Sequence, residues 1–268
     1  MSNERESWPR AIFSGAIALA TVAVAGLTFW STLKQADRDN QAQATEHFNA
    51  GLQDLASGDA AIRLGGVLIL TRIAEQDDRY AEDVLSFLEG LLRGRSQADP
   101  PGDMFKCRSW SEKGSADLTE AAASITKLSR SPGAKGHRLN LSGTCLMYVD
   151  LSGAHLAGAD FSGSNLSGAV LVGTDLTDAA FSYAILQGAV LDQADLTRAT
   201  LDHTNLKCAY AQTVTLTDTI LDGVDGTRTQ IPAGAAAAAK KVPQGFGATA
   251  PGIDPRVHPM GTPGGCVA

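Results

Sequence analysis

Large apolar residues recur every five positions through the middle of the chain. Between residues 141 and 221, the seventeen positions at this spacing hold sixteen Leu or Phe residues, and only Ala211 departs. The residue two positions earlier is usually small, as at Ala154 and Ala159, and the residue one position earlier is often Asp or Asn. A helix repeats about every 3.6 residues and a strand about every two, so this period fits neither element. It predicts a solenoid, in which each unit buries its apolar side against its neighbours.

The repeat A-(D/N)-L-x-x, seen in "ADFSG", "SNLSG" and "TDLTD", resembles the pentapeptide-repeat family. The resemblance covers residues 139–223 and implies a right-handed quadrilateral β-helix, with one pentapeptide on each side of a coil. The segment before the repeats is similar to the helical segment of membrane-anchored bacterial members. We therefore predict a mainly β fold, in which a transmembrane helix and a small α-helical unit precede the β-helix.

An uncharged stretch near the N-terminus predicts a membrane anchor. Residues 1–10 form a charged flank, and residues 11–33 contain no charged side chain. At about 1.5 Å per helical residue, this stretch is long enough to cross the roughly 30 Å hydrocarbon core of a bilayer. The alternative is a signal peptide cleaved after Ala25, because Ala23 and Ala25 match an A-x-A cleavage site.

The four cysteines form no C-x-x-C pair, and we interpret them as free thiols of a reducing compartment. The expected location is therefore the inner membrane, crossed once, with most of the chain in the cytoplasm.

The remaining segments differ in composition. Apolar stripes at helical spacing predict a helical unit over residues 35–95, where the pair Gly65 and Gly66 would let a neighbouring helix approach closely. Residues 96–114 are rich in Pro, Gly and polar residues and predict a linker. A helix is expected over 115–130, with Asp117 and Glu120 at capping-box spacing, and residues 232–268 predict a disordered Ala/Gly/Pro-rich tail.

One outward column of the predicted β-helix is apolar. Successive positions before the large residue hold Asp150, Val170, Val190 and Tyr210, with Val172 beside them. Apolar residues that face outward indicate a covered surface. We therefore predict a protein-contact face, which could bind a partner, pack against the helical unit or form a homodimer. Its members are Val170, Val172, Ile185, Val190 and Tyr210.

The repeats are also acidic. Residues 139–225 hold ten Asp, no Glu, and only Arg198 and Lys207 as cations, within a chain of net charge −7. We predict an acidic face because these Asp residues stack with no cation in their columns: Asp175, Asp195, Asp202 and Asp222. In the quinolone-resistance branch of the family, such a rod is thought to imitate DNA and bind a topoisomerase. A basic patch for direct nucleic-acid binding is lacking.

No nucleophile, base and acid occur together in a recognisable motif, so we predict no catalytic, cofactor or metal site and no enzymatic activity. The expected function is a membrane-tethered scaffold or adaptor that presents rigid β-helix faces to an unidentified protein. The alternative is an acidic DNA mimic that binds a DNA-binding enzyme such as a topoisomerase.

Overall fold

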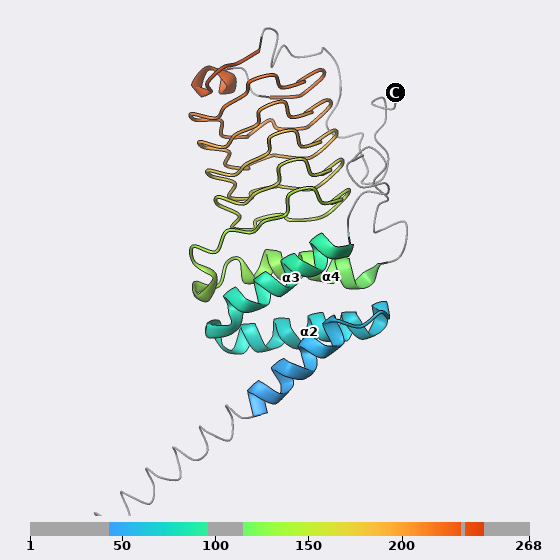
Figure 1. Cartoon of the computed structure of the whole chain (residues 1–268). Helices are drawn as coiled ribbons and strands as arrows, with labels where there is room; N and C mark the ends of the chain where they lie inside the picture. Colours follow the sequence, from blue (N-terminus) through green and yellow to red (C-terminus); the bar gives the residue numbers. More distant parts are fainter. Residues whose placement is uncertain (1–42, 96–114, 232–233, 244–268) are drawn as a thin grey trace, which may run out of the picture. The chain divides into compact units, whose positions relative to one another are not determined.

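The computed structural model describes residues 43–95, 115–231 and 234–243 (Figure 1). The chain divides into two units, Met1–Asn49 and Ala50–Ala268. Residues 43–49 of the first unit are helical. The predicted flank 1–10, transmembrane segment 11–33 and linker 96–114 lie outside the described residues.

The second unit begins with helices that pack on one another. Residues 50–55 are helical, and they are followed by α2 (Ala60–Gln76), η1 (Asp78–Tyr80), α3 (Ala81–Arg95), α4 (Ala116–Leu128) and η4 (Pro132–Ala134). Helices α2, α3 and α4 contact one another pairwise. Their shared core is made of fully buried side chains, including Val67, Leu70, Leu85, Leu88 and Ile125.

Local capping explains where the helical elements start. The Asp59 side chain accepts a hydrogen bond of 2.7 Å from the Ala61 amide at the start of α2. Asp77 follows the end of α2 and caps η1, since its carboxylate accepts from the Arg79 amide. These short polar residues satisfy amides that have no partner within the helix.

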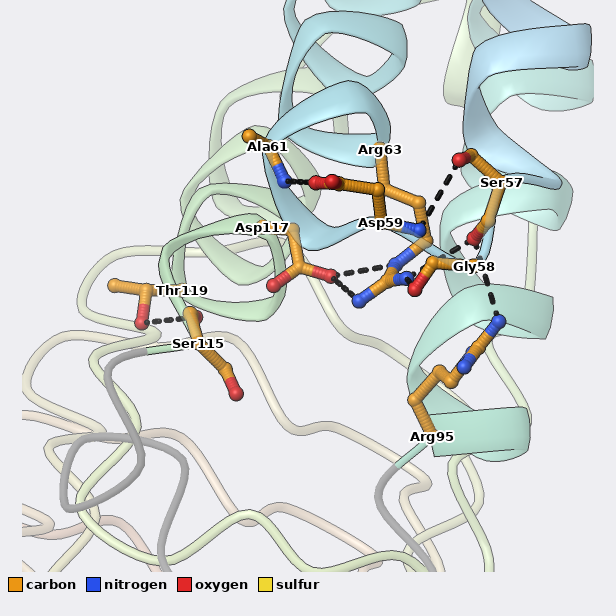
Figure 2. Close-up of polar contacts among 9 residues, drawn as sticks. All are labelled: Ser57, Gly58, Asp59, Ala61, Arg63, Arg95, Ser115, Asp117 and Thr119. Atoms are coloured by element: carbon orange, nitrogen blue, oxygen red, sulfur yellow. Dashed lines mark hydrogen bonds and ion pairs between the residues drawn. The ribbon is translucent and has the colours of Figure 1, made fainter.

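A buried ion pair joins the starts of α2 and α4 (Figure 2). Asp117 Oδ2 accepts a hydrogen bond from Nε of Arg63 and lies 2.8 Å from Nη2 of the same guanidinium. The Asp117 side chain is fully buried. Arg63 Nη1 also donates to the carbonyls of Ser57 and Gly58. The expected capping role of Asp117 is wrong, because its carboxylate serves this long-range pair, and Ser115 precedes α4 without a side-chain cap.

The close approach predicted for the glycine pair involves only one of its members. A Cβ on Gly66 would lie 2.7 Å from the Gly51 carbonyl oxygen and 2.7 Å from the Leu55 amide nitrogen. A Cβ on Gly65 would meet nothing within 4 Å. Gly66 therefore provides the space for backbone to pack against α2.

The repeats form a stack of coils, drawn from green to orange in Figure 1. Sixteen parallel bridges join residues that are twenty positions apart, from Asn140↔Asp160 to Ile220↔Lys240. Each bridge is isolated, and the described residues contain no longer strand. The quadrilateral β-helix is thus present, but it is built from single bridges separated by turns.

Four sides of the β-helix are named here by the residues that fill its interior. Side A holds Leu141, Phe161, Phe181, Leu201 and Leu221. Side B holds Leu146, Leu166, Leu186 and Leu206. Side C holds Leu151, Leu171, Leu191, Ala211 and Ile231. Side D holds Leu156, Leu176, Leu196 and Leu216.

Turns separate the sides. The Ala154 amide donates to the Leu151 carbonyl across such a turn, and the intervening Gly153 has φ of 65°. A positive φ at this position is typical of a type II turn and favours Gly. Tyr183 and Arg198 adopt the same φ of 60°, so the stack holds this conformation even where the residue is not Gly.

The stack continues past residue 223, where the predicted repeat ends. Gln230 is bridged to Tyr210, and Lys240 is bridged to Ile220. Between them lies η5 (Ala235–Ala238). Residues 234–243 therefore differ from the expected disordered tail, while residues 244–268 lie outside the described part.

The predicted inner-membrane location is corrected. Across residues 43–95, 115–231 and 234–243, no helix is long and apolar enough to cross a membrane. The argument for a cytoplasmic chain also fails, because Cys145 and Cys208 are both disulfide-bonded and neither is a free thiol.

Candidate protein-binding face

The interior of the β-helix gives its surface a fixed register. The Phe161 and Phe181 rings stack on side A with centroids 5.1 Å apart and planes 9° from parallel. Backbone amides bond to the next coil throughout, as where Leu171 donates to the Val190 carbonyl at 2.8 Å. Each outward side chain is therefore held at one place in a column.

Buried hydroxyls add bonds between coils that the sequence pattern did not predict. Thr174, Thr204 and Thr219 occupy small-residue positions and are almost fully buried. Their Oγ1 atoms donate to carbonyls of the preceding coil at 3.0, 2.6 and 2.7 Å. The Thr hydroxyls themselves could have indicated these bonds, because a buried polar group needs a hydrogen-bond partner.

Side C brings together most of the predicted contact face. Val170 is bridged to Val190, and Val190 is bridged to Tyr210. These three residues, the apolar column, are half-buried, and so is Val172 beside them. Ile185 does not belong to this surface, because it lies on side B and is only 6% exposed.

Polar groups border the apolar column at both ends. Arg130, just after α4, donates to the carbonyls of Gly153 and Ser152 at 2.7 and 2.9 Å. Further along the stack, Gln212 donates to the Gln230 side chain at 3.4 Å. The apolar area is thus a strip with a polar border.

The helical unit contacts the first coil of the stack. The Asn140 amide donates to Glu89 of α3 at 3.0 Å, and the His155 amide donates to the Ser129 hydroxyl at 3.0 Å. Among the described residues, these hydrogen bonds between the helical unit and the coils reach Asn140, Ser152, Gly153 and His155, and none of them reaches the apolar column.

Tyr210 lies where the stack changes its turn geometry. Burial and the negative charge of Asp192 raise the pKa of the Tyr210 hydroxyl, so it stays neutral at physiological pH. At the adjacent corner, the Gln193 amide donates to Thr213 Oγ1 at 2.8 Å, and Thr213 donates its amide to Asp192 at 3.3 Å. Thr213 has no positive φ, unlike the equivalent residue of most turns, in keeping with its β-branched side chain.

The predicted acidic face is divided between two sides. Asp175 and Asp195 begin side D segments and are half-buried. Each carboxylate accepts from the amide and the hydroxyl of the Thr two residues later, Thr177 or Thr197. These aspartates therefore stabilise local turns. The D-x-T pattern in the sequence could have indicated this role.

The other two predicted acids follow side A and have cationic or ionisable neighbours. Asp202 lies 3.0 Å from His203 Nδ1, and Asp222 lies 3.2 Å from Lys241 Nζ. The expectation of columns without a cation is therefore wrong at Asp222, because Lys241 comes from the segment that was expected to be disordered.

One exposed ion pair is bidentate. Arg198 donates to both carboxylate oxygens of Asp178 at 2.7 and 2.6 Å. This hydrogen bonding lowers the pKa of Asp178 and raises that of Arg198. Asp218 pairs instead with Lys240 at 3.0 Å. Much of the exposed negative charge is thus neutralised locally.

Comparison with known families agrees with this architecture. The family model described as pentapeptide repeats matches residues 144–181 and 174–209, in eight copies. The chain is a pentapeptide-repeat protein. Its pentapeptide-repeat domain belongs to a family whose members are generally non-catalytic, and the described residues hold no cluster of His, Cys, Asp or Glu suited to a metal ion.

Solved structures of pentapeptide-repeat proteins also resemble the domain. A protein of the Arabidopsis thaliana thylakoid lumen is 28% identical, with 40% of this chain and 78% of that chain covered and a TM-score of 0.30. HetL from Nostoc, involved in heterocyst differentiation regulation, is 29% identical over 35% of this chain and half of its own, with a TM-score of 0.25.

The fluoroquinolone resistance protein QnrB1 is 18% identical over 37% of this chain and 70% of its own, with a TM-score of 0.15. TM-scores this low carry no argument about function. The search of curated proteins found no match.

Proposed function

We propose that this pentapeptide-repeat protein is a non-enzymatic scaffold that binds a different protein through side C. The observation that carries the proposal is the apolar column of Val170, Val190 and Tyr210. Aspartates at equivalent positions, such as Asp160 and Asp175, accept hydrogen bonds from the residue two positions later and so have a local role. The apolar column has no such local role, and binding a partner would remove its exposed apolar surface from water.

The border of the column indicates the chemistry of the partner. Asp150 precedes the apolar column, and Asp192 lies near Tyr210. A partner with an apolar strip flanked by Lys or Arg would match both features, because opposite charges at the rim guide association and orientation. Binding should therefore weaken moderately, but persist, at high salt.

Rigidity supports binding in this mechanism. Coil-to-coil backbone bonds hold the apolar column before any partner arrives, as where Val190 donates to Ala169 at 2.9 Å. Little backbone entropy is then lost on association, which is the main benefit of a preorganised surface.

The DNA-mimic alternative has less support. It needs an array of unpaired negative charges, whereas Asp178 and Asp222 lie against cations. A DNA mimic would bind its enzyme through sides A and D, with strong salt dependence.

Val190→Asp tests the proposal, with Thr200→Asp as its matched control. Both residues are half-buried at bridged positions, Val190 on side C and Thr200 on side A. We expect full-length Val190→Asp to lose a bound protein that the wild type and Thr200→Asp retain, with similar melting temperatures for both variants. Retention by Val190→Asp would overturn the proposal.

A further inference from the structure

The apolar surface of side C widens around its second interior residue, Leu171. Val170 and Val172, which precede and follow Leu171, both face outward and are half-buried. At the position of Val172, the other described segments of side C carry polar side chains: Ser152, Asp192 and Gln212. The segment that contains Leu171 therefore presents a broader apolar surface than the segments on either side of it.

Gly173 leaves open space directly beside this broader surface. It is exposed and has φ of 64°, and a Cβ added to it would meet nothing within 4 Å. One coil earlier, the corresponding space is filled, because a Cβ on Gly153 would lie 2.6 Å from Nη2 of Arg130. One coil later, the same position holds the side chain of Gln193. We call three residues the open corner of side C: Val170, Val172 and Gly173.

Opposite charges border the open corner, one coil to either side. The Gly153 amide donates to the Val172 carbonyl at 2.8 Å, and Arg130 is bonded to the Gly153 carbonyl. On the other side, the Gly173 amide donates to the Asp192 carbonyl at 2.8 Å. Because adjacent coils are about 4.8 Å apart, the open corner lies between a cationic and an anionic residue.

Both charged groups can still bind a partner. An Arg guanidinium has five N–H donors. Arg130 uses Nε and Nη2 for carbonyls of the first coil, which leaves Nη1 unengaged among the described residues. Asp192 accepts the Thr213 amide at 3.3 Å, and within the described part of the chain no cation pairs with its carboxylate. The two charges therefore remain available to opposite charges on a bound protein.

We propose that the partner of side C anchors itself at the open corner through one large apolar side chain with an acidic residue next to it. The inference rests on the proposed function and makes its partner more specific. The apolar side chain lies on Val172 and occupies the space beside Gly173, where its burial concentrates binding energy. The acidic residue binds Nη1 of Arg130, and a Lys or Arg of the partner meets Asp192, which fixes the orientation of the complex.

Gly173→Gln closes the open corner with a side chain that the stack already accepts. Gln193 occupies the equivalent position of the next coil with φ of 59°. The matched control is Gly143→Gln, at the corner between sides A and B. Gly143 is also exposed, has φ of 63°, and has nothing within 4 Å of an added Cβ. The melting temperatures of the two variants should therefore agree.

Photo-crosslinking from position 190 of the full-length protein in native cells provides the readout. We expect Gly173→Gln to lower the yield of the protein adduct about tenfold, the effect of losing one anchor residue, while Gly143→Gln leaves the yield unchanged. Arg130→Lys should retain more adduct than Arg130→Gln, because both variants lose the paired bonds to the first coil and differ in charge.

The possible results separate this inference from the proposed function. An adduct that forms equally well with Gly173→Gln overturns the anchor at the open corner but leaves a partner on side C. Equal yields from Arg130→Lys and Arg130→Gln overturn the acidic residue of the partner. The absence of any adduct from position 190 in otherwise wild-type protein contradicts the proposed function, and this inference with it.

Discussion

The helical unit and the β-helix stabilise themselves in opposite ways. The helical unit relies on contacts that occur once, such as the buried pair of Arg63 and Asp117 and the backbone approach at Gly66. The β-helix repeats the same contact on every coil, as in the hydroxyl bonds of Thr174, Thr204 and Thr219. Single contacts should therefore dominate the stability of the helices, whereas each coil contributes a smaller share.

This difference also determines where a substitution changes only the surface and where it changes the packing of the fold. On the β-helix, an outward residue can change from Asp to Val along a column without altering the bridges, as between Asp150 and Val170. A solenoid of this kind presents a surface whose chemistry is independent of its fold. In the helical unit, a change at Asp117 or Gly66 alters the packing itself.

The largest expected effect is at Asp117. Asp117→Ala leaves the Arg63 guanidinium buried without its counter-ion and should lower the free energy of unfolding by about 3–5 kcal/mol. Urea denaturation, followed by circular dichroism, measures the loss. The double variant Arg63→Met and Asp117→Leu should recover most of it. A loss no greater than that of the exposed Asp178→Ala would contradict the contrast between the two regions.

Substitutions at Gly66 and Gly65 form a matched pair with smaller expected effects on the free energy of unfolding. Gly66→Ala places a methyl group against backbone atoms and should cost about 1–3 kcal/mol. Gly65→Ala meets no neighbour and should stabilise α2 by up to about 1 kcal/mol, because Ala favours the helix. Melting temperatures of the two variants should move in opposite directions. Equal shifts would mean that the close approach is not specific to Gly66.

In the β-helix, Thr204→Val should cost only about 1 kcal/mol, the net value of one hydrogen bond. The Phe181 carbonyl that accepts from Thr204 still accepts from the Ala184 amide at 2.9 Å, so it is not left without a partner. Chemical denaturation of both proteins measures the difference. A loss of unfolding free energy as large as that of Asp117→Ala would contradict the view that each coil contributes only a small share of the stability.

The smallest effect concerns the exposed pair of Asp178 and Arg198, and it depends on pH. The pKa of Asp178 is lowered from 3.8 in the folded state, so the pair stabilises the fold above that value. The contribution disappears as the pH falls through the folded pKa. Wild type and Asp178→Asn should therefore differ slightly in melting temperature at neutral pH and converge in acid. A difference that grows in acid would contradict this sign.

Periodic features of the fold were predictable from sequence, and non-periodic ones were not. The five-residue spacing predicted the coils and brought Val170, Val190 and Tyr210 into one column, because a twenty-residue coil determines which residues stack. The same spacing places Ile185 one corner away from that column, and Ile185 lies on side B, bridged to Asn165 and Asn205.

Long-range partners escaped prediction for a physical reason. Arg63 and Asp117 are 54 positions apart, and no local pattern links them. The same holds for the disulfides of Cys145 and Cys208, which the isolated spacing of the cysteines made look like free thiols. Lys240 and Lys241 pair with acids because the stack continues into an Ala-rich segment whose composition indicated disorder.

Site-specific photo-crosslinking tests the central claim, that side C binds a partner protein. A photoreactive amino acid replaces Val190 in full-length protein in native cells, with the same substitution at Thr200 as control. We expect an adduct with one different protein from position 190, absent from position 200 and lost when Val170→Asp is added. No adduct specific to position 190, or an adduct with a second copy of this chain, would contradict the account.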